Sequence, residues 1–405
     1  MVDNNVFRAG FFADRGFDFE TRVVLGQATY GSADAGEVLA TIARIEDGNV
    51  DSWVAAWSAL GDRLAGIAAA AQQAGHGVSA RNAWLRAAVA YAATLNALAE
   101  AEGTGALLPM FRKHREAWSQ SCALRSPAWE PVSIPYEGTT LPGWFAAPEA
   151  GKVRRPTLIL NNGSDGPISS MIAFGGAGAL ERGYNVLFFD GPGQQSMLFE
   201  RGVFFRHDWE AVITPVVDWL LPRADVDPGA IALYGVSQAG YWVPRAIAHE
   251  HRLAAAIADT GVVDVSDSWL RHMPKPMVDL LHAGERDKFN AIMAQSDGDP
   301  KLVAMWNFRA RPYGGREPFA TLEAMLRYRI ADEDAAKIRT PLFITDPEGE
   351  QFWPGQAERL AAMTPGVSTL VKFTAAEGAN FHCEPMARRL VDQRMFDWLD
   401  RVLRR

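Results

Sequence analysis

Six short apolar segments recur between residues 156 and 374 and are separated by stretches with a helical pattern. In chain order they are PTLILNN, YNVLFFD, AIALYGV, LAAAIAD, TPLFITD and STLVKFT. Segments this uniformly apolar are typical of strands buried on both faces of a parallel sheet, which repeated strand–helix units build. The sequence therefore predicts an α/β fold around a mostly parallel central sheet, with functional side chains at the carboxyl ends of its strands.

The remaining stretches suggest how the chain is divided. From about residue 36 to 120, apolar residues recur every three or four positions in Ala- and Leu-rich stretches such as SWVAAWSALGDRL, which predicts a layer of helices. Near residue 130, two strand-like runs flank Glu137-Gly138. We therefore expect a helical cap domain over residues 1–130 and a catalytic domain over residues 131–405. Residues 260–338 are helical in character and too long for a simple loop, so we expect a helical insertion over the carboxyl edge of the sheet.

Charge and composition exclude several classes of function. The 40 basic and 48 acidic residues give a net charge of −8, and no block of Lys and Arg could follow a nucleic-acid backbone. No apolar run is long enough to span a membrane and no signal-peptide pattern is present, so we expect a cytoplasmic protein that binds neither membrane nor nucleic acid. Cys122 and Cys383 are too few for a disulfide framework or a thiolate metal site. We expect no metal and no cofactor.

A serine stands where a nucleophile would be expected. Ser237 lies in the stretch Gly235-Val236-Ser237-Gln238-Ala239-Gly240, which follows the apolar segment IALY and precedes a helix-like segment. This strand–turn–helix context is that of a nucleophile elbow, in which small neighbours tolerate a tight and strained turn. A serine in an ordinary loop is the alternative, and Ala239 stands where many elbows have glycine. We predict that Ser237 is the nucleophile.

The loops after the last two predicted strands supply a possible base and acid. His382 lies in AAEGANFHCEP, after STLVKFT, and an imidazole titrates near neutral pH, as a general base requires. Asp346, Glu348 and Glu350 lie together after TPLFIT. The chain order serine, carboxylate, histidine is that of a catalytic triad. We favour Glu350 as the acid, since the loop has room to turn there, with Asp346 as the alternative.

Two backbone amides are needed to stabilise an oxyanion. The first is expected from Gln238, directly after the nucleophile, and the second from Ser164 or Asp165 in the glycine-containing loop LNNGSDGP.

Aromatic residues offer candidates for substrate binding. Trp57, Trp84 and Tyr91 lie in the helical part and Tyr241 follows the elbow. Tryptophans at helical spacing are more often core residues than ligand contacts, but a subset could line a pocket between the two parts.

At these motifs the chain resembles the α/β-hydrolase fold, and more narrowly its subgroup with an amino-terminal helical domain. The resemblance extends from SWVAAWSALGDRL through FFDGPGQQS and YGVSQAGYW to DPEGEQFWPGQ and EGANFHC. The subgroup includes 2,6-dihydroxypseudooxynicotine hydrolases, fungal hydrolases that shorten polyketide chains, and fermentation-respiration switch proteins. The resemblance implies a serine hydrolase with its site between the two domains, carbon–carbon bond cleavage beside a ketone, and possible homodimers. Glu350 replaces the aspartate of many relatives.

Three classes of function follow. The first is a hydrolase that attacks the carbonyl of a small-molecule substrate, with retro-Claisen cleavage of an aryl ketone or β-dicarbonyl favoured over carboxylic-ester hydrolysis. The second is an acyl-transferring cyclase or thioesterase, in which another nucleophile replaces water. The third is a binding protein, which would need neither Ser237 nor His382.

Overall fold

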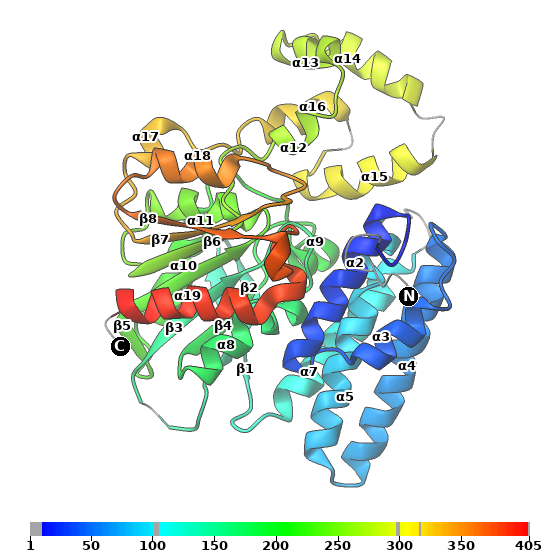
Figure 1. Cartoon of the computed structure of the whole chain (residues 1–405), viewed down its shortest axis with the longest axis vertical. Coiled ribbons are helices and arrows are strands. Elements are labelled where there is room, and N and C mark those ends of the chain that lie inside the picture. Colours follow the sequence, from blue (N-terminus) through cyan, green and yellow to red (C-terminus); the bar gives the residue numbers. More distant parts are fainter. Residues whose placement is uncertain (1–9, 101–104, 152, 297–299, 316, 404–405) are drawn as a thin grey trace.

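An eight-stranded sheet forms the centre of the computed structural model, which describes residues 10–100, 105–151, 153–296, 300–315 and 317–403 (Figure 1). The strand order is β1-β2-β4-β3-β5-β6-β7-β8. The strands are β1 Glu130–Tyr136, β2 Thr139–Ala146, β3 Arg155–Asn161, β4 Asn185–Phe189, β5 Val226–Val236, β6 Ala255–Asp259, β7 Leu342–Pro347 and β8 Ser368–Phe373. Strands β3 to β8 pair in parallel, whereas β1 with β2 and β2 with β4 pair antiparallel. The predicted α/β fold with a mostly parallel sheet is confirmed.

Helices cover both faces of this sheet, as the repeated strand–helix pattern requires. Those that follow the strands are α8 Gly176–Glu181, α9 Gln195–Arg201, α10 Glu210–Leu220, α11 Ala239–Ile247, α18 Gln356–Met363 and α19 Arg388–Val402. Among the helices that the structure describes, none combines the length and the apolar character needed to cross a membrane.

The amino-terminal part is helical and packs beside the sheet (Figure 1, blue to cyan). Its helices are α2 Arg15–Gly26, α3 Ala35–Ile42, α4 Val50–Gln73, α5 Gly77–Ala92, α6 Leu95–Glu100 and α7 Leu107–Ala123. One apolar cluster runs from these helices into the sheet, where the ring of Trp118 on α7 meets Trp129, Trp144 and Phe188 at centroid distances of 5.6–5.7 Å. The two parts thus share a core. The change from helices to strands falls near residue 130, while the division into a cap domain and a catalytic domain stays a prediction.

In the described residues between β6 and β7, six α-helices lie within the segment expected to be an insertion. They are α12 Asp267–Leu270, α13 Lys275–His282, α14 Arg286–Met293, α15 Pro300–Ala310, α16 Pro318–Met325 and α17 Asp332–Ala335. Helix α15 packs against α6 of the amino-terminal part, so the insertion bridges to it (Figure 1).

Close packing of α8 on α19 depends on Gly178. A Cβ atom at Gly178 would lie 2.5 Å from a carboxylate oxygen of Asp392 and 2.7 Å from the ring of Phe396. Both neighbours are buried, so neither can move away without disturbing the core.

We expect Gly178→Ala to lower the free energy of unfolding by about 1–3 kcal/mol, because the extra methyl overpacks this contact. Gly66 on α4 is the matched control, since it is exposed and a Cβ there would meet nothing within 4 Å. Gly66→Ala should stabilise the protein by about 0.5–1 kcal/mol. Urea denaturation measures both. Equal effects of the two substitutions would contradict the packing argument.

Candidate active site

Ser237 occupies a strained turn between β5 and α11. Its φ angle is +59°, a left-handed conformation that costs a non-glycine residue on the order of 1–3 kcal/mol. Close approach of the backbone requires small neighbours: a Cβ on Gly163 would lie 2.7 Å from the Cβ of Ser237, and one on Gly240 would lie 1.7 Å from the carbonyl oxygen of Thr260. The local geometry is therefore that of the expected elbow.

The side chains of Ser237, His382 and Glu350 form a continuous hydrogen-bonded chain. Nε2 of His382 lies 2.8 Å from Oγ of Ser237, and Nδ1 lies 2.8 Å from Oε2 of Glu350. The backbone amides of Phe352 and Trp353 donate to Oε1 of Glu350 at 2.8 and 3.1 Å. Burial opposes ionisation of Glu350, but His382 and the two amides offset it and hold the pKa of Glu350 below its usual value. This carboxylate is thus suited to orient the imidazole and to stabilise its protonated form.

The two other acidic candidates lie elsewhere. Asp346 is still inside β7, paired in register with Lys372 of β8, and its carboxylate lies 3.4 Å from the ammonium of Lys372. Glu348 accepts a hydrogen bond from the backbone amide of Ala375 at 2.8 Å. The structure brings Glu350, and not the alternative Asp346, to the imidazole.

The predicted oxyanion residues lie beside the serine. Gln238 begins α11, and Ser164 and Asp165 follow Gly163, which contacts Ser237. Within the described part of the chain, the backbone N–H groups of Gln238, Ser164 and Asp165 donate to no protein acceptor. Free amides on two sides of the nucleophile are what stabilisation of an oxyanion requires.

A cavity of about 360 Å³ lies beside the hydrogen-bonded residues Ser237, His382 and Glu350. Gln238, Phe352 and Trp353 line it, and the ring centroids of Phe352 and Trp353 lie 4.7 and 5.7 Å from that of His382. The cavity is therefore lined by residues that contact His382, the expected base.

Parts of the chain outside the loops of the three hydrogen-bonded residues also contribute to the walls of this cavity. Asn96 and Ala99 come from α6, Trp269 and Phe308 from the insertion, and Phe205 from the loop after α9. Sequence patterns did not identify these residues as a binding site. The one available signal was the prediction that residues 260–338 cover the carboxyl edge of the sheet.

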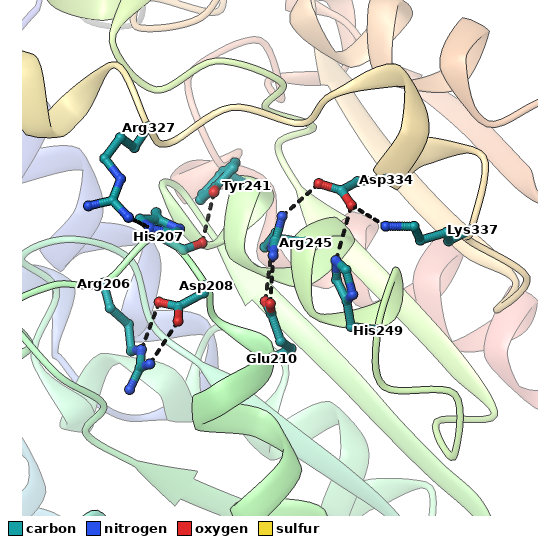
Figure 2. Close-up of polar contacts among 10 residues, drawn as sticks. All are labelled: Arg206, His207, Asp208, Glu210, Tyr241, Arg245, His249, Arg327, Asp334 and Lys337. Carbon is teal, nitrogen blue, oxygen red and sulfur yellow. Dashed lines mark hydrogen bonds and ion pairs between the residues drawn. The ribbon is translucent and has the colours of Figure 1, made fainter.

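The four aromatic residues expected at the pocket do not line it. Trp57 is fully buried in the core, Trp84 donates to Oε1 of Gln72 at 3.1 Å, and the hydroxyl of Tyr91 donates to Asp62 at 2.8 Å. The hydroxyl of Tyr241 donates to the carbonyl of His207 at 2.8 Å (Figure 2). None of Trp57, Trp84, Tyr91 and Tyr241 lines this cavity, so their part in substrate binding stays a prediction.

Charged contacts anchor the helix that follows the nucleophile. Figure 2 shows Arg245 of α11 between Glu210 of α10 and Asp334 of α17, with ion-pair distances of 2.6 Å to each. Asp334 also contacts His249 and Lys337, at 3.1 and 2.8 Å. Helix α11 is thereby tied to a helix of the sheet layer and to the end of the insertion.

A second polar cluster lies beneath the triad and is completely buried. Arg388 donates to the carboxylate of Asp259 at 3.0 Å, to the carbonyl of Cys383 at 2.8 Å and to the hydroxyl of Tyr234 at 2.6 Å. Burial works against a charge on Asp259, but Arg388 outweighs it and the pKa of Asp259 falls below its usual value. Burial and the neighbouring Asp259 raise the pKa of Glu384 well above its usual value, which favours its neutral form beside Asp259 and Arg388.

The order of strands and the serine elbow define the protein as an α/β-hydrolase, a hydrolytic enzyme. Residues 113–371 match the model of the X-Pro dipeptidyl-peptidase (S15) family, and the chain belongs to that family.

Its relatives include fungal hydrolases. Hydrolase LUC6 from Fusarium sp is 30% identical over 403 residues, which cover 95% of this chain and 96% of that protein. The 20-hydroxy-prefusarin hydrolase FUS2 from Gibberella moniliformis is 28% identical, with coverages of 96% and 97%. These matches run through the helical part as well as the α/β part.

Among solved structures, 2,6-dihydroxy-pseudo-oxynicotine hydrolase has a similar fold. The TM-score is 0.69 at 20% identity, over 93% of this chain and 95% of that one. AbyA5 follows with a TM-score of 0.62 at 16% identity, over 91% and 94%. The resemblance to α/β-hydrolases with an amino-terminal helical part is confirmed.

We expect Glu350→Gln to lower kcat by on the order of 10⁴-fold, because an amide neither fixes the imidazole tautomer nor balances an imidazolium charge. Asp346→Asn should leave kcat close to that of the unmodified enzyme, since Asp346 does not reach His382. Steady-state hydrolysis of a p-nitrophenyl ester measures both variants. A larger loss for Asp346→Asn than for Glu350→Gln would move the acid to Asp346.

We expect Arg388→Met to lower the free energy of unfolding by about 3–5 kcal/mol, because it leaves the carboxylate of Asp259 buried without its cation. The double variant Arg388→Met/Asp259→Asn removes that charge and should recover much of the loss. Urea denaturation compares the two. A double variant no more stable than Arg388→Met would show that charge balance is not what the cluster contributes.

Proposed function

We propose that the protein is a serine hydrolase that cleaves a carbon–carbon bond beside a ketone, by a retro-Claisen reaction on an aryl ketone or β-dicarbonyl compound. The observation that carries the proposal is the chain of hydrogen bonds from Ser237 through His382 to Glu350. The carbon–carbon bond is favoured because of the resemblance to the subgroup with an amino-terminal helical part.

The contacts suit the following steps. His382 takes the proton of Ser237 as Oγ bonds to the substrate carbonyl carbon, and the amides of Gln238 and of Ser164 or Asp165 stabilise the oxyanion. When the carbon–carbon bond breaks, its electron pair leaves as an enolate, which takes the proton from His382 and becomes a ketone. Water, deprotonated by the same imidazole, then attacks the acyl-enzyme and releases a carboxylic acid.

The residues that line the cavity suit an aromatic or conjugated substrate. Its lining includes the rings of Trp269, Phe308, Tyr313, Phe352 and Trp353, which offer flat apolar faces. A delocalised enolate leaves more readily than an isolated carbanion, so a conjugated leaving group fits both the chemistry and the walls.

We expect Ser237→Ala to lose hydrolysis of an aryl β-diketone by about 10⁴-fold or more and to lose covalent labelling by a fluorophosphonate. Exposed Ser79 on α5 is the matched control, and Ser79→Ala should keep both activities. Product analysis by mass spectrometry in ¹⁸O-labelled water identifies the bond broken. A labelled acid with a ketone supports the proposal.

Other outcomes of the same experiment separate the alternatives. Turnover of esters but of no diketone would assign ester hydrolysis, and a lactone free of ¹⁸O would assign acyl transfer to a hydroxyl of the substrate. Full activity of Ser237→Ala would overturn the nucleophile itself.

A further inference from the structure

The wall of this cavity contains an arginine that pairs with no carboxylate in the part of the chain that the structure describes. Two arginines, Arg309 and Arg311, line the cavity, and Asp165 is the one carboxylate among the described lining residues. Arg309 pairs with Asp165 at 2.8 Å. Within the described chain, Arg311 makes neither an ion pair nor a side-chain hydrogen bond. Its guanidinium lies over the ring of Phe199, 5.4 Å from the centroid.

Within the described residues, the N–H groups of Arg311 have no protein acceptor and can therefore bind a ligand. An arginine that lies over an aromatic face keeps its N–H groups free in the plane, where they can bind a carboxylate through two parallel hydrogen bonds. Phe199 also lines the cavity, so the contact belongs to the same wall. In a site with mainly apolar walls, such a pair is worth more than it would be in water.

The segment that carries Arg311 is fixed relative to the nucleophile. The carbonyl of Pro312 accepts a hydrogen bond from the amide of Phe205 at 2.7 Å. The hydroxyl of Tyr313 donates to Oε1 of Gln238, the residue after Ser237, at 3.2 Å. Contacts on both sides therefore hold this turn in place, and binding a ligand at Arg311 need not order it first.

We propose that Arg311 binds a carboxylate of the substrate, so that the enzyme acts on carbonyl compounds that carry an acidic group away from the bond that is cleaved. The proposal rests on the proposed function, because it names the substrate class of the same site. Asp165 cannot take the place of that carboxylate while Arg309 holds it. The excess positive charge of the lining favours an anion over a neutral ligand of equal size.

The test compares two ester series that differ in one charge. Mono-p-nitrophenyl esters of dicarboxylic acids from adipate to sebacate carry a distal carboxylate, and their methyl esters do not. For at least one chain length, we expect kcat/KM of the acid to exceed that of its methyl ester by about 10- to 100-fold. In Arg311→Met this ratio should fall to about one, in Arg311→Lys it should lie between, and added salt should lower it in the unmodified enzyme.

Arg112→Met is the matched control, because Arg112 is exposed on α7 and does not line the cavity; it should keep the ratio of the unmodified enzyme. A ratio near one for every chain length in the unmodified enzyme, or an unchanged ratio in Arg311→Met, would overturn the proposal. Hydrolysis of the aryl β-diketone and fluorophosphonate labelling of Ser237 report on the proposed function separately, so the two proposals can fail independently.

Discussion

The buried pair of Arg388 and Asp259 is the interaction on which the arrangement of the active site depends. Asp259 ends β6, and its backbone carbonyl accepts a hydrogen bond from the amide of Ser237. Arg388 also holds the carbonyl of Cys383, the residue after His382. Ser237 and His382 are thus both attached to one cluster. Both charged groups are buried away from water, so their attraction offsets the cost of desolvation only while the hydrogen-bond geometry is kept.

This attachment explains how Ser237 is kept in an unfavourable conformation. A left-handed serine persists only where surrounding contacts outweigh its cost. Here the amide of Ser237 is bound to Asp259, its carbonyl accepts from the amide of Gly240, and Gly163 packs against its Cβ. On the far side of α11, the ion pairs of Arg245 prevent the helix from shifting. Contacts from several neighbouring elements therefore hold the strained turn of Ser237 in place.

Sequence patterns predicted the sheet and the elbow because both depend on local chemistry. A strand buried on two faces must be uniformly apolar, and a turn as tight as that of Ser237 excludes large neighbours such as a side chain at Gly240. The sequence pattern could not distinguish Asp346 from Glu350 as the expected acid, because the position of each carboxylate depends on how far β7 continues to pair with β8. Nor could it tell Trp57 from a pocket residue, since helical spacing shows that a face is buried but not which element buries it.

The walls of the cavity and the residues expected to react with a substrate come from different parts of the chain. The triad stands on loops held by the central sheet, whereas α6 and the insertion provide much of the surface that a substrate would meet. Substitutions in the walls can change which ligand fits without disturbing the hydrogen bonds of the triad, since the side chains of Trp269 and Phe308 take no part in them. Arg309 is an exception, because its ion pair with Asp165 reaches the loop expected to stabilise the oxyanion. This ion pair links α15 to that loop, so a substitution at Arg309 can affect the loop as well as the wall of the cavity.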